Sequence, residues 1–162
     1  MESDCAMEFE RILLPVEFSA LSEPAIEAAL ALARGRYTTV ELLHVIETFD
    51  GLEGDPEIEH FYQRLEKRAA AALARTHKRF EAKGINATWQ VIIGHRAPVI
   101  VERARDTDAD VIVMGTHSVQ EGSPAAVLSS TSHRVTLLAP CAVMIVGRQA
   151  LMRAIKAQEA RA

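Results

Sequence analysis

The segment between residues 111 and 135 has the order of a phosphate-binding turn. The apolar run 111–114 ends at Gly115, and Ser123 followed by Pro124 indicates the start of a helix. A strand that leads through a glycine turn into a helix often binds a nucleotide phosphate. The reason is that backbone N–H groups and the partial positive charge of the helix start point at the anion. The segment therefore predicts a phosphate site.

Two features of this turn weaken that prediction. Lysine and arginine are absent between Arg105 and Arg134, so no neighbouring cation is expected, and Glu121 repels a polyphosphate. The positive features are the backbone N–H groups, the helix start and His117, for which a solvated loop residue is the equal alternative. We therefore interpret the turn as the remnant of a nucleotide-binding loop.

Several other side chains could do chemistry. Glu17 lies at the end of the first apolar run. It has either a functional role, as a ligand or catalytic acid, or a structural one, as a turn carboxylate that caps the next helix. The hydroxyls at 129–132 are candidate nucleophiles, but no G-x-S-x-G elbow is present, so we interpret them as helix-start hydroxyls. His44 lies within an expected strand and is interpreted as structural. The remaining histidines lack metal-ligand spacing, and no metal site is expected.

The elements that must position these residues follow from hydrophobic patterning. Strands are expected at 11–16, 38–46, 86–93, 110–114 and 141–147. Helices are expected from Ser22 to Gly35, at 57–83, from Pro98 to 106, from Ser123 to just before Pro140, and at 149–160. Strands that alternate with helices form an open parallel sheet with helices on both faces. Ligands of such α/β sheets sit beyond the carboxyl ends of the strands.

Composition restricts the class of protein. The 162 residues suit one domain, and 49% hydrophobic with 25% charged residues is typical of a globular chain. The net charge of −4 disfavours a nucleic-acid surface, and no run reaches the roughly 18 apolar residues of a membrane helix. The acidic first ten residues do not resemble a secretory signal, and Cys5 and Cys141 fit free thiols. We expect a cytoplasmic protein.

Five pieces of the sequence together resemble the universal stress protein family over nearly the whole chain. They are ILLPVEFS at 12–19, LLHVIE at 42–47, VIIGHRAPVIVERA at 91–104, DADVIVMGTH at 108–117 and LSSTSHRVTLLAPCAVMIVG at 128–147. Each piece alone is weak support for the resemblance, whereas the order and spacing of all five are specific to the family. The resemblance implies a Rossmann-like, adenine nucleotide alpha hydrolase-like sheet of strand order 3-2-1-4-5. It also implies, as is usual in the family, a homodimer.

The resemblance also implies where a nucleotide would bind. Binding members carry G-x-x-G, nine residues, then G and Ser or Thr after the fourth strand. Here Gly115 matches the first glycine, Ser118 replaces the second, Ser129 replaces the third, and Ser130 stands at the position of the Ser or Thr. Ten residues separate Ser118 from Ser129, so the loop is one residue longer than the pattern. The candidate binding residues, the first four of them on the adenine side, are Pro15, Val16, Glu17, Val45, Met114, Gly115, His117, Ser118, Ser129, Ser130 and Thr131.

The missing glycines are expected to weaken binding. Glycine adopts positive φ and lets a phosphate approach the backbone closely, whereas serine in the left-handed region costs about 1–2 kcal/mol. Two such positions remove roughly tenfold to a thousandfold of affinity. Glu17, where binding members usually have Asp, adds a methylene. We therefore expect no tightly bound cofactor, and ATP or AMP as weak ligands.

Three functions remain open at this point. The first is a non-enzymatic, dimeric stress-response protein with weak or no ATP binding and a protein partner that the sequence does not identify. The second is an ATP-binding stress-signalling module, and the third, least favoured, is a nucleotide hydrolase. An enzyme needs a positioned base or metal ligand near the turn, where only Glu17, His117 and Glu121 are available.

The expected organisation is a tail at 1–9, a universal stress protein domain at 10–148 and a C-terminal helical extension at 149–162. In the implied strand order the segment 141–147 forms a sheet edge. It is apolar and carries no charge, so a second copy is expected to pair with it.

Overall fold

A computed structural model describes residues 9–20, 22–48, 54–115 and 130–147, together with residues 149 and 153. Outside these ranges lie the tail before residue 9, the part 123–129 of the helix expected from Ser123, and the candidate site residues 117, 118 and 129. The helix expected at 149–160 also lies outside them, apart from those two single residues. In the described part no helix is long and apolar enough to cross a membrane.

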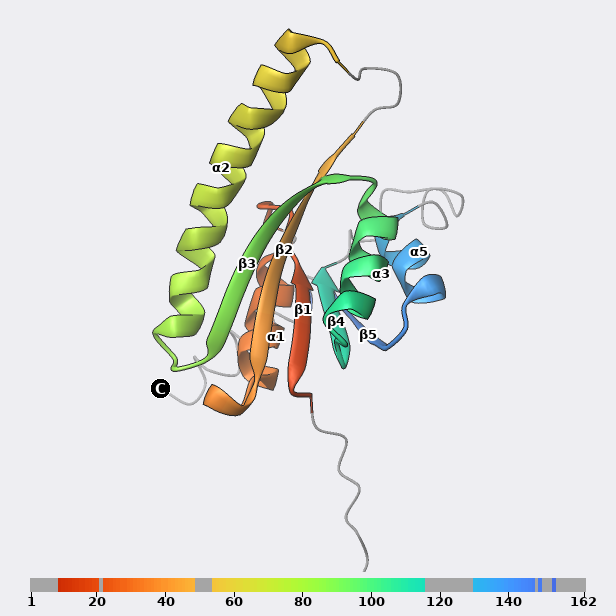
Figure 1. Ribbon diagram of the computed structural model, residues 1–162. Coiled ribbons are helices and arrows are strands. Elements are labelled where there is room, and N and C mark those ends of the chain that lie inside the picture. Colours follow the sequence, from red (N-terminus) through yellow and green to blue (C-terminus); the bar gives the residue numbers. More distant parts are fainter. Residues whose placement is uncertain are drawn as a thin grey trace, which may run out of the picture.

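Five parallel strands form a single sheet in the order β3-β2-β1-β4-β5 (Figure 1). Their bounds are β1 Arg11–Pro15, β2 Thr39–Glu47, β3 Asn86–Gly94, β4 Val111–Gly115 and β5 Ala142–Val146. The α/β class, the parallel sheet and the strand order expected from the sequence are thus confirmed. The chain adds strands on one side of β1 and then crosses to the other side, so the strand order reverses between β1 and β4.

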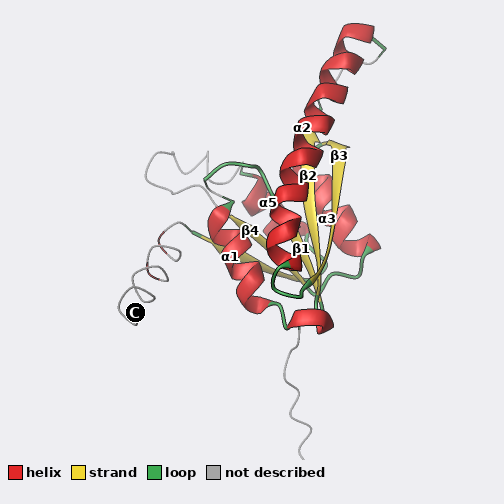
Figure 2. Ribbon diagram, turned by 90° about the vertical axis from the view of Figure 1, so that its left-hand side faces the viewer, coloured by secondary structure: helices red, strands yellow, loops and turns green. Residues whose placement is uncertain are grey.

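The helices cover both faces of the sheet (Figure 2). They are α1 Glu23–Leu32, α2 Pro56–Glu81, α3 Arg96–Asp106 and α5 Thr131–Leu138, with a 3₁₀ helix η1 at Gly35–Tyr37. The prediction that Gly35 ends the first helix is wrong, because α1 ends at Leu32. Gly35 instead begins η1 at φ +57°, a left-handed conformation that favours glycine. The third helix starts at Arg96, two residues before Pro98.

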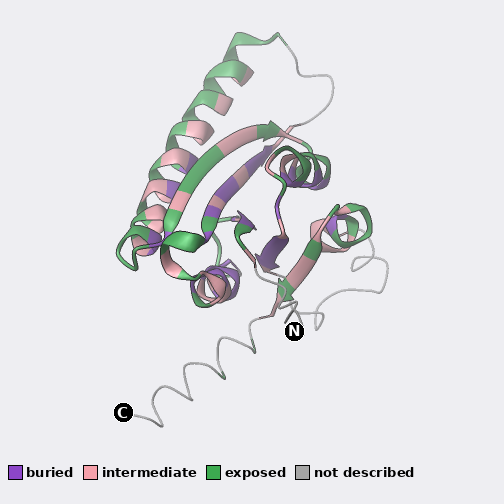
Figure 3. Cartoon of the chain, turned by 60° about the horizontal axis from the view of Figure 1, so that its bottom comes forward, coloured by how far each residue is buried: buried purple, intermediate pink, exposed green. Residues whose placement is uncertain are grey.

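The core forms one apolar layer on each face, with the buried residues concentrated in the middle strands (Figure 3). Ile12 and Leu14 of β1 pack with residues of α1 and α2, among them the fully buried Leu73 and Phe80. Leu13, between them in β1, points to the opposite face and packs with residues of α3 and α5. This alternation arises because successive side chains of a strand point to opposite faces.

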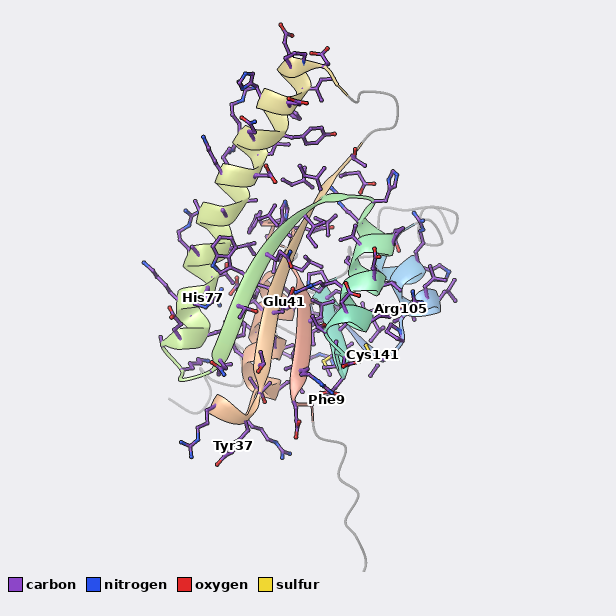
Figure 4. All side chains as sticks on the ribbon, in the orientation of Figure 1. Phe9, Tyr37, Glu41, His77, Arg105 and Cys141 are labelled. Atoms are coloured by element: carbon purple, nitrogen blue, oxygen red, sulfur yellow. The ribbon has the colours of Figure 1, made fainter. Side chains whose placement is uncertain are left out.

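Polar contacts fix the helices on the sheet. The Arg103 guanidinium of α3 donates to Glu41 of β2 at 2.6 and 3.1 Å. On the opposite face, Nε2 of His77 in α2 lies 2.8 Å from the carbonyl oxygen of Ala87 in β3. Figure 4 labels Glu41 and His77 on these elements. The first turns of α2 extend beyond the end of the sheet, as Figure 1 shows, and only its later turns reach the core.

The predicted continuous helix from Ser123 to Pro140 is wrong at Ser130. This residue has φ −65° and ψ 150°, an extended conformation that interrupts a helix, and α5 begins only at Thr131. The start expected at Ser123 lies outside the described residues. The reason for the break is local, since a serine side chain at this position satisfies a free N–H group at the helix start.

Candidate nucleotide-binding site

A cavity of about 440 Å³ opens at the carboxyl ends of the central strands. It lies where the strand order reverses between β1 and β4, the position at which open α/β sheets bind ligands. Its volume falls in the range of small-molecule sites. We call it the β1/β4 pocket. Its lining residues are Pro15, Val16, Glu17, Ser19, Ser22, Leu43, His44, Val45, Arg96, Ile100, Met114, Gly115, Ser130, Thr131 and Ser132.

The turn after β1 is held by backbone and hydroxyl contacts. The Val16 N–H donates to the carbonyl oxygen of Leu43 at 2.8 Å and so continues the ladder past the end of β1. The Glu17 N–H donates to the hydroxyl of Ser22 at 2.9 Å. Ser22 is buried and occupies the N-cap position of α1. These contacts fix the main chain of Glu17, and its side chain stays exposed at the pocket.

The start of α5 provides the opposite wall. The Ser130 hydroxyl accepts from the His133 N–H at 3.2 Å and lies 3.2 Å from the hydroxyl of Ser132. Ser130 is thus the N-cap, which confirms the interpretation of this residue as a helix-start hydroxyl. Because the first N–H groups of a helix carry partial positive charge, this wall can accept an anion.

His44 occupies the floor of the pocket. Its Nδ1 lies 2.7 Å from the Val16 carbonyl oxygen, which can only accept, so Nδ1 carries the proton and donates. Burial lowers the pKa of His44, and the positive charge of Arg96 lowers it further, although the Val16 hydrogen bond and Glu17 oppose the change. The prediction of a structural histidine satisfied by a neighbour is confirmed. The ring also lines the pocket, which the strand pattern did not indicate.

Arg96 corrects the expectation that the site has no neighbouring cation. The chain has no lysine or arginine between Arg105 and Arg134, but Arg96, which precedes that segment, begins α3 and lines the pocket. Its Nε lies 3.5 Å from Oε2 of Glu47, the last residue of β2. The element order of the sheet places this helix start beside the carboxyl end of β2, a relation that the spacing in the chain does not reveal.

The pocket brings together most of the residues expected from the sequence. Eight of them line it, namely Pro15, Val16, Glu17, Val45, Met114, Gly115, Ser130 and Thr131. His117, Ser118 and Ser129 lie outside the described residues. Seven further lining residues were not predicted as part of the site, because their segments indicated only a strand, a turn or a helix start. They are Ser19, Ser22, Leu43, His44, Arg96, Ile100 and Ser132. No group of three or more metal-ligating side chains occurs in the ranges that the structure describes.

A model of the universal stress protein family matches residues 8–147. The chain belongs to this family. The match spans every described strand and helix of this universal stress protein, from β1 to β5. The resemblance read from the five sequence pieces is thereby confirmed.

Characterised relatives agree with this family. The chain is 28% identical over 147 residues to universal stress protein YxiE of Bacillus subtilis, covering 85% of this chain and 99% of that one. It is 29% identical over 140 residues to universal stress protein MJ0531 of Methanocaldococcus jannaschii, covering 85% and 82%. The relatives therefore match this universal stress protein over nearly their whole length.

Solved structures share the fold. Protein MJ0577 superposes with a TM-score of 0.71 at 26% identity, over 86% of this chain and 96% of that one. A universal stress protein family protein from Arabidopsis thaliana, solved with AMP bound, has a TM-score of 0.65 at 17% identity, over 85% and 91%. Another universal stress protein, solved in complex with cAMP, has a TM-score of 0.63 at 19% identity, over 86% and 97%.

Proposed function

We propose that this universal stress protein is a non-enzymatic, dimeric stress-response protein whose β1/β4 pocket binds adenine nucleotides weakly. The observation that carries the proposal is the composition of that pocket. Residues from the ends of β1, β2 and β4 and from the start of α5 meet around one cavity at the strand-order reversal. Adenosine monophosphates bound to two structural neighbours support this class of ligand.

The phosphate side of the pocket supports weak rather than tight binding. Where binding members of the family carry two further glycines, this chain has Ser118 and Ser129. Serine at a left-handed position costs about 1–2 kcal/mol, which corresponds to roughly tenfold for each position. The Ser130 hydroxyl already accepts a hydrogen bond in capping α5, so one of its lone pairs is not available to a ligand.

The same residues support the proposed non-enzymatic role. A hydrolase needs a base or a metal ion beside the scissile phosphate. The Ser130 hydroxyl contacts Ser132 and the His133 N–H, and neither group is a base. His44, whose Nδ1 donates to Val16, belongs to β2 and not to the start of α5. We therefore assign the pocket to binding.

The dimer is proposed on the outer edge of β5. Among the strands that the structure describes, β5 pairs only with β4, and the exposed Ile145 lies on it. Leu137 and Leu138 at the end of the neighbouring α5 are 70% and 52% exposed. An apolar sheet edge with exposed leucines beside it is a surface that natural proteins pair or cover. A second copy joined about a two-fold axis pairs both edges at once.

Calorimetric titration with ATP and with AMP tests the nucleotide part. We expect dissociation constants in the high micromolar range or weaker, and no adenine nucleotide in mass spectra of the purified protein. A co-purified nucleotide or a submicromolar constant contradicts weak binding. That outcome supports the second candidate, an ATP-binding stress-signalling module, which is favoured by the guanidinium of Arg96 at the pocket.

A further inference from the structure

A second cavity, of about 600 Å³, lies between the carboxyl end of β2 and the inner side of α2. We call it the α2 cleft. Glu17, His44, Val45 and Arg96 line both this cleft and the β1/β4 pocket, so the two cavities adjoin. The residues that line only the cleft are Phe18, Ile46, Glu47, Phe61, Leu65, Arg68, Ala69, Ala72 and Arg75.

One stripe of α2 forms the outer wall of the cleft. Phe61, Leu65, Arg68, Ala72 and Arg75 recur at intervals of three and four residues, which places them along one side of the helix. The two arginines are seven residues, or two turns, apart, which corresponds to roughly 10 Å along the helix axis. The small side chain of Ala72 lies between them and leaves space in the wall.

The cleft exposes large apolar side chains. Phe18 is 39% exposed and Phe61 is 47% exposed. The Phe18 ring stacks on His44 with 4.4 Å between ring centroids. The backbone of Phe18 has φ +58°, a left-handed conformation that is uncommon for a bulky residue and that recurs at functional sites. A hydrocarbon body bound here covers both rings.

Arg68 and Arg75, which are exposed to solvent, differ from the half-buried arginines of α2 and α3. Arg79 is bound by Glu23 and Glu27, and Arg103 by Glu41. Within the ranges that the structure describes, neither Arg68 nor Arg75 forms an ion pair or a side-chain hydrogen bond. Their guanidinium groups are therefore available to an anion.

The acidic groups of the cleft lie at its other end. Glu47, at the end of β2, interacts with Arg96 and with His95, and Glu17 belongs to the turn after β1. The α2 wall itself carries two positive charges and no negative ones among its lining residues. Along α2 the apolar Phe61 and Leu65 come before Arg68 and Arg75, so the cleft suits a ligand that is apolar over most of its length and negative at one end.

We propose that the α2 cleft binds an amphipathic monocarboxylate. Its hydrocarbon body packs on Phe18, Phe61 and Leu65, and its carboxylate accepts hydrogen bonds from Arg68 and Arg75. Arginine suits this role because its planar group presents two parallel donors to a carboxylate. The carboxylate end of this site is separate from the nucleotide pocket, because neither Arg68 nor Arg75 lines the β1/β4 pocket.

Displacement of a fluorescent probe tests the proposal. The protein is saturated with 8-anilinonaphthalene-1-sulfonate, an aromatic anion, and titrated with decanoate or with decanol, which has the same chain length and no charge. We expect decanoate to displace the probe at concentrations at least about tenfold lower than decanol, because hydrogen bonds to charged groups contribute a factor of this size. Equal potency of the two competitors overturns the proposal.

Three variants test which side chains cause the preference for decanoate. Arg68→Gln with Arg75→Gln is expected to abolish the preference for decanoate and leave AMP affinity unchanged. Lys67→Gln with Lys78→Gln removes the same charge from exposed positions of α2 and is expected to keep the preference. Phe61→Ala is expected to weaken both competitors. Circular dichroism melting confirms that each variant is folded.

Two outcomes contradict the assignment. If the arginine variant keeps the preference for decanoate, the anion site lies elsewhere. If it loses AMP affinity as well, the cleft is part of the nucleotide site and not a separate one. Failure of AMP to bind the wild type contradicts the proposed function alone and leaves the decanoate result unaffected.

Discussion

The guanidinium Nε of Arg96 lies 3.5 Å from Oε2 of Glu47, and the Arg96 main-chain N–H donates to the same oxygen at 3.3 Å. Glu47 thus holds both the side chain and the helix start of α3 at the mouth of the β1/β4 pocket. Arg96 also lines the neighbouring α2 cleft. Arg96, which Glu47 holds at the end of β2, therefore lies at the boundary between the two cavities.

Replacing Arg96 tests its role toward nucleotides. Arg96→Gln is expected to weaken AMP binding by about three- to tenfold, because it removes a charge-assisted donor that is partly exposed to solvent. The effect is measured by calorimetry at low salt, since screening reduces the contribution of an exposed charge.

Arg105→Gln is the matched control for this change. Arg105 lies on the same helix, is exposed and does not line the pocket (Figure 4). Both variants lose one positive charge, so a general field effect lowers both affinities equally. Equal affinities of the Arg96 and Arg105 variants therefore exclude a direct contact between Arg96 and the phosphate.

Restoring the glycine pattern tests why binding is weak. Ser118→Gly combined with Ser129→Gly is expected to tighten ATP binding by roughly tenfold or more, because glycine removes the cost of positive φ at two positions. The dissociation constants of wild type and double variant are compared by calorimetry. If the dissociation constant is unchanged, either Glu121 or the longer loop causes the weak binding. The additional variant Glu121→Gln distinguishes between these two causes.

The exposed edge of β5 predicts the oligomeric state. Ile145→Pro removes a backbone donor from the edge strand and fixes φ, so it is expected to convert a dimer to a monomer with less damage than a proline in an interior strand. Light scattering at micromolar concentration measures the mass of wild type, Ile145→Pro and a chain ending at Gly147. A monomeric wild type ends the dimer proposal. A dimer that survives Ile145→Pro places the interface on another surface.

His44 predicts a pH dependence of stability. Because burial lowers its pKa below the ordinary value of 6.5, the unfolded chain binds this proton more readily than the folded one. The contribution of His44 to the free energy of unfolding is therefore complete above pH 6.5 and is lost as the pH falls toward its lower folded pKa. We expect wild type to lose more stability between pH 7.5 and pH 5.5 than His44→Asn.

Asparagine is the matched replacement for His44, because its side-chain amide N–H can donate to the Val16 carbonyl oxygen as Nδ1 does. Urea unfolding at the two pH values gives the free energies. Contributions from the rest of the chain are common to both proteins and cancel in the difference. Parallel losses in the two proteins contradict the assignment to His44.

Local patterns in the sequence were sufficient to predict the strands of this fold. The buried run at 11–16 and the β-branched run at 38–46 became β1 and β2 to within one residue, because short apolar runs between turn residues have few other ways to fold. Gly35 misled the prediction of the end of α1. A glycine at positive φ serves any left-handed position, and here that position lies in η1, three residues after the helix.

The sequence by itself determined the α/β class, the strands and the residues that follow their carboxyl ends, since hydrophobic period and turn chemistry are local properties. It also carried the family pattern that placed Glu17, Gly115 and Ser130 together. Only the tertiary structure decided that Arg96 reaches the pocket, that His44 forms its floor and that Arg68 and Arg75 face a second cavity. These relations depend on which strand ends and helix faces become neighbours, and that adjacency arises from packing across the sheet between residues far apart in the chain.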